Sequence, residues 1–182
     1  MGEDLQARFG QTPGQVAIRA TVTTRKDALM TDTALPKAIP QEIASFLDHW
    51  VGAIRAKDPT AYAACYTDDV RVFDGMNPSQ YRGLDAWREM IEACFGTLGT
   101  ETDLVLRDVQ VQTAGDMAVV TAIVGYWSVL HGETEKRGMW GRQTNILRWT
   151  SAGWRICHEH SSVPFNGETG EADFAMRPEG DE

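Results

Sequence analysis

The chain has 182 residues, of which 42% are apolar and 9% aromatic, and its net charge is −9. This length suits one domain of ordinary size with additional segments, and the composition is sufficient for a hydrophobic core. The sequence lacks a run of about 18 apolar residues, a signal pattern at the N-terminus and a basic stripe, so we expect a cytoplasmic protein with neither a membrane nor nucleic acid as its partner.

The two ends of the chain differ from its middle. Residues 1–37 show no sustained period, and we interpret them as an N-terminal extension, with disorder as one reading of their composition. Residues 166–182 hold six acidic side chains and one basic side chain, so this segment supplies −5 of the net charge. We interpret it as a solvated acidic tail. The domain itself is predicted to span residues 38–165.

Three helices are predicted in the first half of the domain. Apolar residues from Ile43 to Ile54 recur at the spacing of a helix that is buried on one face, and Pro40 suits its first position. Asp58 followed by Pro59 is the start signal of a second, short helix. After an alternating strand at residues 68–75, a third apolar stripe predicts a helix over residues 84–98.

The second half of the domain is predicted to be sheet. Alternating or apolar runs cover residues 104–112, 117–130, 139–150 and 154–164, and turn residues separate them. The run at 117–130 is apolar on both faces, which predicts that both of its sides are covered. Helices followed by long strands indicate an α+β fold, with the helices packed on one face of a curved antiparallel sheet.

The last predicted strand, "WRICHEHSSVP", carries two histidines. Residues two apart share a face of a strand, so His158 and His160 are predicted to lie on the same side as Ile156, inside the fold, unless a bulge intervenes. Buried imidazoles require hydrogen-bond partners, which favours a cavity with polar walls. Satisfied core histidines remain an alternative, as does an open metal site with Asp74, although no further ligand pattern supports a metal.

Two motifs resemble the nuclear transport factor 2-like superfamily, and specifically its SnoaL-like branch. "YTDDVRVFDGMNPSQYRG" resembles the segment after the second helix of ketosteroid isomerases, and "RWTSAGWRICHEHSSVP" resembles the terminal strand pair of SnoaL-like proteins. The second motif is also similar to the association domain of calcium/calmodulin-dependent kinase. The resemblance implies a cone of curved sheet closed by three helices, a pocket at its open end and a homodimer built on the outer sheet face.

The resemblance to ketosteroid isomerases also implies roles for single residues. The general-base aspartate falls on Asp74, the oxyanion tyrosine on Trp50 and the protonated aspartate on Asn145. Trp50 offers only an indole N–H and Asn145 only an amide N–H, and both are weaker donors than the groups they replace. The matches therefore favour proton abstraction by Asp74 over steroid isomerisation.

Two functions follow as hypotheses. The first is an isomerase, cyclase or lyase that uses cofactor-free general-base proton transfer on a small hydrophobic molecule, with no metal. Its predicted catalytic residues are Asp74, His158 and His160, and its predicted substrate-binding residues are Trp50, Tyr81, Asn145, Leu147 and Ile156. The alternative is a non-catalytic module of the same fold that binds a small molecule or dimerises, because this fold serves many functions.

Overall fold

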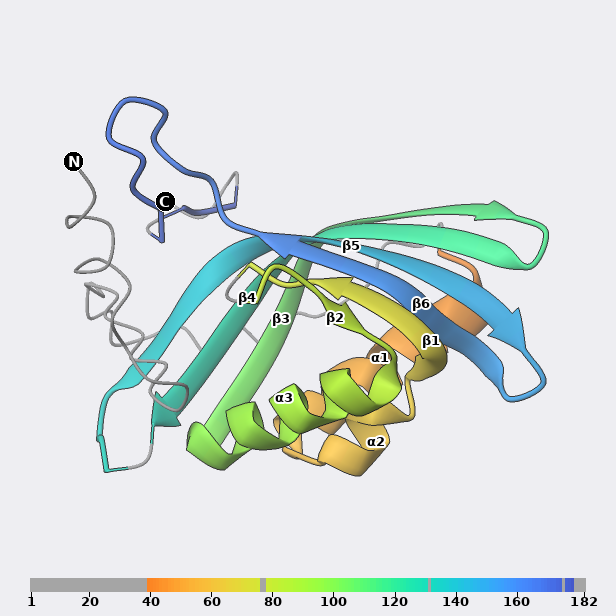
Figure 1. Cartoon of the computed structure of the whole chain (residues 1–182), viewed down its shortest axis with the longest axis horizontal. Coiled ribbons are helices and arrows are strands. Elements are labelled where there is room, and N and C mark those ends of the chain that lie inside the picture. The colour runs from red at the N-terminus through yellow and green to blue at the C-terminus, as the bar shows by residue number, and fades with distance from the viewer. Residues whose placement is uncertain (1–38, 76–77, 131, 175, 179–182) are drawn as a thin grey trace, which may run out of the picture.

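The computed structural model describes residues 39–75, 78–130, 132–174 and 176–178, so the predicted N-terminal extension lies outside the described residues. The elements follow the predicted order of helices and then strands (Figure 1). They are α1 (Gln41–Arg55), α2 (Pro59–Ala63), β1 (Tyr66–Phe73), β2 (Tyr81–Arg82), α3 (Leu84–Thr97), β3 (Leu98–Ala114), β4 (Met117–Leu130), β5 (Lys136–Thr150) and β6 (Gly153–Ser162).

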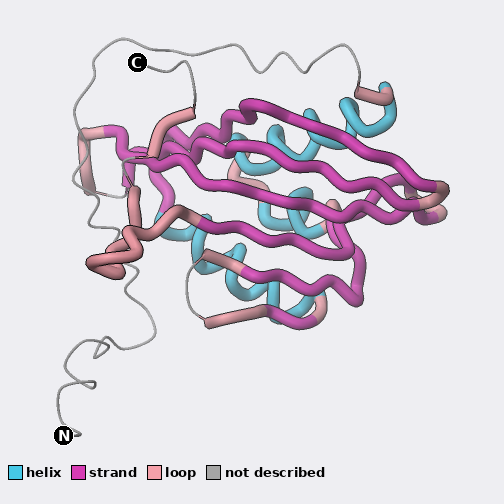
Figure 2. Tube along the Cα trace, turned by 90° about the horizontal axis from the view of Figure 1, so that it is seen from above, coloured by secondary structure: helices cyan, strands magenta, loops and turns pink. Residues whose placement is uncertain are grey.

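The strands form one curled sheet in the order β2-β1-β6-β5-β4-β3. The three helices lie against its concave face, and the view from above shows the strands lying across them (Figures 1 and 2). The predicted α+β cone is confirmed. The sheet is nevertheless mixed rather than wholly antiparallel, because β1 pairs with β6 in parallel.

The apolar stripe of α1 builds the centre of the core. Its residues Ile43, Leu47 and Trp50 are each at most 1% exposed. They meet inward side chains of the sheet, among them Leu104 and Leu147, which are fully buried. Burial of side chains this large contributes about 1.5–3 kcal/mol each, so the helix is fixed against the sheet mainly by its apolar face.

Local signals explain how the helices begin and where α1 is tied to the sheet. The Asp58 side chain accepts a hydrogen bond from Ala61 N at 2.9 Å and caps α2, with Pro59 at its first position. At the C-terminus of α1, Arg55 Nε lies 2.7 Å from Asp103 Oδ1 on β3. Lys57 Nζ donates to the carbonyl oxygens of Leu98 and Gly99. None of the helices in the described ranges is long and apolar enough to cross a membrane.

The outer face of the sheet is only partly covered. Successive side chains of β4 point to opposite faces of the sheet. Val120 and Val124 are buried on the inner face, whereas Val119 on the outer face is 38% exposed. Ile123 on β4 and Ile146 on β5 share that outer face and are half-buried. The prediction that both sides of this strand are covered is therefore wrong for the part of the chain that the structure describes.

Candidate acid–base site

A β-bulge in β6 decides which of its side chains face the interior. Leu147 on β5 is paired with Ile156, but the preceding Ile146 is paired with His158, so Cys157 is an extra residue in β6. One inserted residue reverses the facing of all the residues that follow it. Ile156 remains inside at 0% exposure, and the next inward residue is Glu159 rather than His158.

The two histidines lie on the outer face of the sheet. The ring of Phe73 on β1 contacts both imidazoles edge-on, with centroid distances of 5.0 Å to His158 and 5.8 Å to His160. The guanidinium of Arg71 lies 4.7 Å from the centre of the same Phe73 ring. The prediction that both imidazoles point inward beside Asp74 is wrong, because the bulge at Cys157 interrupts the simple alternation.

The Glu159 side chain points into the interior, and its carboxyl group lies in a buried cluster with tyrosine hydroxyl groups. It is 3% exposed, and its Oε2 accepts a hydrogen bond of 2.7 Å from the Tyr66 hydroxyl. The Tyr66 oxygen lies 2.7 Å from the Tyr62 hydroxyl and accepts a 3.3 Å hydrogen bond from Trp50 Nε1. The carboxyl group therefore sits at the end of a fully buried polar network between α1, α2 and the sheet.

Burial sets the protonation of this network. Burial is the main cause that raises the pKa of Glu159 to about 7. The Tyr66 hydrogen bond opposes this shift, and the charge of Asp74 adds a smaller upward contribution. Burial and then the Glu159 charge raise the pKa values of Tyr62 and Tyr66 well above their ordinary range. The two tyrosines thus stay neutral, and Glu159 changes charge near neutral pH.

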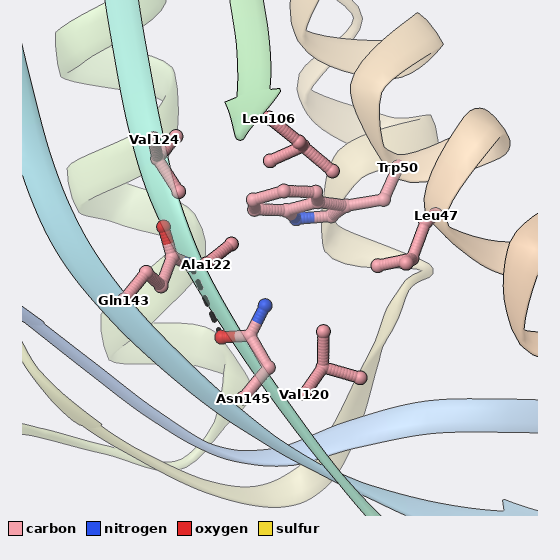
Figure 3. Close-up of a pocket in the computed structure, with 8 residues that line it drawn as sticks. All are labelled: Leu47, Trp50, Leu106, Val120, Ala122, Val124, Gln143 and Asn145. Carbon is pink, nitrogen blue, oxygen red and sulfur yellow. Dashed lines mark hydrogen bonds between the residues drawn. The ribbon is translucent and has the colours of Figure 1, made fainter. Parts of the chain in front are cut away.

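A small hollow lies between α1 and the sheet (Figure 3). Its polar wall comes from β5, where Gln143 Nε2 donates to Asn145 Oδ1 at 3.1 Å, and Gln143 Oε1 accepts from the Tyr126 hydroxyl at 2.6 Å. The Asn145 amide nitrogen points into the hollow (Figure 3). The lining residues are Leu47, Trp50, Leu106, Val120, Ala122, Val124, Gln143 and Asn145.

The hollow is small compared with the expected ligand pocket. Its volume is about 10 Å³, which is about the room that one water molecule needs. Leu47 and Trp50 of α1 close it on the helix side (Figure 3). A molecule larger than water can therefore enter only if these side chains move.

Asp74 lies directly after β1, at the inner side of the sheet. It is half-buried, and the Ser161 hydroxyl donates to its Oδ1 at 3.4 Å. Ser161 accepts in turn from Gly75 N at 3.0 Å, which fixes the turn after Asp74. The charge of Asp74 adds to the effect of burial in raising the pKa values of Tyr81 and Tyr126, so this carboxylate faces the interior.

The predicted substrate-binding residues fall into three groups. Trp50 and Asn145 line the hollow. Tyr81 is half-buried near Asp74 and packs on Trp87, with ring centroids 5.2 Å apart. Leu147 and Ile156 are fully buried in the core and do not line the hollow.

Glu159 and the two tyrosines that hold it, Tyr62 and Tyr66, were not among the predicted site residues. The signal available for Glu159 was its place as the one acidic residue of this strand, between His158 and His160. Tyr62 and Tyr66 are four residues apart around a helix end, a spacing at which side chains can meet. Among the described residues no three His, Cys, Asp or Glu side chains lie close enough to hold a metal ion.

Comparison with known proteins shows the family to which this chain belongs. The model of the SnoaL-like domain family matches residues 43–166, and the chain therefore belongs to this family. No curated protein matches.

Solved structures agree with this assignment. An NTF2-like protein of unknown function from Pseudomonas putida is 30% identical, with a TM-score of 0.68 over 75% of this chain and 94% of the other. An NTF2-like superfamily protein from Salmonella enterica is 21% identical, with a TM-score of 0.62 over 72% and 95% of the two chains. A ketosteroid isomerase-like protein from Erwinia carotovora is 23% identical, with a TM-score of 0.56 over 68% and 97%.

Proposed function

We propose that this protein is an enzyme that transfers protons on a small, rather apolar molecule, with Asp74 as the general base. The observation that carries the proposal is the position of Asp74, on the inner side of the sheet at the end of β1, where Ser161 holds it. Isomerases, cyclases and lyases all use removal of a proton from carbon, so the proposal covers these three reaction types and requires no cofactor.

The surroundings of Asp74 suit this role. A base must be held in place, and the Ser161 hydroxyl donates a hydrogen bond to Asp74 Oδ1. The hollow between α1 and the sheet, which Asp74 itself does not line, is mostly apolar, with the polar side chains of Gln143 and Asn145 on one wall. A few polar groups in an apolar site are typical of pockets that orient a small molecule.

The small volume of the hollow favours the alternative of a module that does not catalyse a reaction. Nothing larger than about one water molecule fits in this conformation. An enzyme therefore requires movement of Leu47 and Trp50 when its substrate binds, whereas a dimerisation module requires none. The two functions differ in what they predict for proton exchange.

Deuterium exchange tests the proposal. Acetone is a suitable probe because it is among the smallest enolisable ketones, and incorporation of deuterium from heavy water can be followed by NMR. We expect the wild-type protein to accelerate exchange and Asp74→Asn to lose the acceleration with little change in Tm. Asp48→Asn, on the exposed side of α1, is the matched control and should exchange like wild type. Equal exchange by wild type and Asp74→Asn would overturn the proposal.

We also propose that two copies pair through the outer face of the sheet. The support is the apolar row formed by Val119, Ile123 and Ile146, which the described residues leave partly exposed. Apolar side chains left partly exposed on one face of a sheet are available for an interface. Light scattering after size-exclusion chromatography should give the mass of two chains for wild type and of one chain for Ile123→Lys. A single-chain mass for wild type would contradict the pairing.

A further inference from the structure

We propose that the C-terminal arm, residues 163–174, docks on a cationic patch on the outer sheet face of a second copy of this chain. This inference rests on the proposed pairing of two copies through that face, and it adds the segment that reaches across and the surface that receives it. The cationic patch is formed by side chains of β1, β2, β5 and β6, namely Arg71, Phe73, Arg82, Arg142, His158 and His160.

The strand register places the patch on the outer face of the sheet. The inward residues of β1 and β6 at these positions are buried, so the patch residues that alternate with them point outward. Arg71 is paired with Arg82 of β2 on one side and with His158 of β6 on the other. Phe73 is paired with His160. Neighbouring strands lie about 4.8 Å apart, so paired side chains stand next to each other on one face.

The Phe73 ring holds the centre of the patch in place. The Arg71 guanidinium lies 4.7 Å from the ring centre, and both imidazoles contact the ring edge-on. Arg71 Nε also donates to Gln80 Oε1 at 3.0 Å. Within the described residues, the three arginines of the patch form no ion pair with an acidic side chain. A patch whose centre is held in place before binding has a lower ordering cost when an acidic partner docks.

The arm is a short hairpin that follows directly after β6. Phe165 and Ala172 form an antiparallel bridge, and Asn166 N donates to the Glu171 carbonyl oxygen at 2.8 Å. At the turn, Asn166 Oδ1 accepts a hydrogen bond from Glu168 N at 2.8 Å. A hairpin of two strands is only marginally stable by itself in water, so packing on a further surface would stabilise it.

The arm carries apolar and acidic groups that its own chain leaves exposed. Phe165 is 72% exposed and Phe174 is 42% exposed. Glu168 and Glu171 are exposed as well. Figure 1 shows the arm looping away from the end of β6, on the side of the sheet opposite the helices. The arm thus stays off the patch of its own chain, whose arginines are exposed too.

The patch adjoins the apolar row of the proposed interface. Ile146 of that row is paired with His158, and Ile123 is paired with Arg142. In a two-fold pair the contacts are reciprocal, so the arm beside the row of one copy meets the surface beside the row of the other. Interfaces are enriched in aromatic side chains and arginine, and the rings of the arm and the arginines of the patch fit this composition.

Charge favours the same partner. The net charge of the chain is −9, and residues 166–182 supply −5 of it. Two copies with this charge repel one another unless opposite charges meet at their interface. The acidic arm of one copy against the arginines of the other provides that contact, and arginine binds carboxylates through two parallel hydrogen bonds.

Sedimentation equilibrium of full-length variants measures the Kd of the dimer. We expect Phe165→Ser/Phe174→Ser to weaken pairing at least about 10-fold, because it removes the aromatic groups that the partner buries. The arm variant Glu168→Lys/Glu171→Lys should weaken pairing by a similar factor, because its lysines then face the arginines of the partner.

The patch variant Arg71→Glu/Arg142→Glu should weaken pairing like the arm variant, because acidic groups then face the acidic arm. Matched charge changes on the helix side are the controls. Glu89→Lys/Glu92→Lys and Arg88→Glu, all on exposed positions of α3, should pair with the Kd of wild type.

Mixing the arm variant with the patch variant shows whether the arm crosses to the other copy. In a mixed dimer, one arm and patch are both wild type, and the other arm and patch have exchanged their charges, so both contacts are attractive. With one variant labelled with ¹⁵N, native mass spectrometry resolves mixed dimers from the two like dimers. We expect mixed dimers well above the share that random pairing gives.

The outcomes separate the arm from the pairing on which it rests. If wild type forms dimers and the arm and Phe165→Ser/Phe174→Ser variants pair equally well, the role of the arm is overturned and the proposed pairing stands. Mixed dimers at the random share would overturn docking between copies, because contacts within one chain give no preference for mixing. If wild type has the mass of one chain at every concentration, the proposed pairing is overturned, and the docking of the arm with it.

Discussion

Replacement of Glu159 by glutamine should change how the stability of the protein depends on pH. The pKa of Glu159 is about 7 in the folded protein and 4.5 is its ordinary value. Between these two pH values the folded chain holds a proton that the unfolded chain has released, so stability falls as the pH rises through this window. Below about pH 4.5 the contribution is fully present, and above about pH 7 it is lost.

The size of the effect follows from the two pKa values. At about 1.4 kcal/mol for each pH unit, the free energy of unfolding should fall by about 3 kcal/mol across the window. Glutamine is neutral at every pH and keeps the acceptor for the Tyr66 hydroxyl. Glu159→Gln should therefore resemble wild type near pH 5 and be more stable than wild type by about 3 kcal/mol near pH 8.

Urea unfolding at several pH values between about 5 and 8 measures this difference. Other groups titrate in the same range, so the informative quantity is the difference between wild type and variant at each pH. Glu89→Gln should follow the wild-type curve throughout. Curves for wild type and Glu159→Gln that stay parallel would refute the reasoning, because they would show that Glu159 binds its proton equally in both states.

Further variants test the packing and the facing of the sheet. Tyr66→Phe should lower the free energy of unfolding by about 1–3 kcal/mol, since it leaves buried donors without an acceptor, and urea unfolding would show it. Gly138→Ala should cost at least about 1 kcal/mol, because its Cβ would collide with the Tyr126 carbonyl and the Trp127 ring. Gly52→Ala, with open space around it in α1, should instead stabilise by about 0.5–1 kcal/mol, and equal Tm changes for the two would contradict both. His160→Lys should leave Tm within a few degrees of wild type, whereas Glu159→Lys should prevent folding; circular dichroism that shows the reverse would place His160 inside.

Elements with strong local signals could be predicted from the sequence. The apolar stripe of α1 and the cap at Asp58 predicted helices that the structure contains, and β4 spans Met117–Leu130 as expected. The partner of each strand could not be predicted in the same way. The parallel pairing of β1 with β6 depends on contacts between residues some 90 positions apart, which no local pattern encodes.

The candidate site was predicted in part. Trp50 and Asn145 line the hollow, and Asp74 follows β1 with its carboxylate toward the interior, while the roles that the resemblance implies for them stay predictions. The predicted facing of the β6 side chains is wrong after Cys157. A one-residue bulge has no sequence marker, and it moves each later side chain to the opposite face of the sheet. The residue between the two histidines, Glu159, is thus the one that reaches the interior.

An infrared titration tests most directly whether Glu159 is a buried acid that is neutral near physiological pH. The carbonyl stretch of a protonated carboxyl group is followed from about pH 5 to 9 in wild type, Glu159→Gln and His160→Gln. We predict a band that titrates with a midpoint near 7, is missing from Glu159→Gln and is retained in His160→Gln. A wild-type spectrum without a carboxyl band above about pH 5.5, or a band that survives in Glu159→Gln, would contradict the assignment.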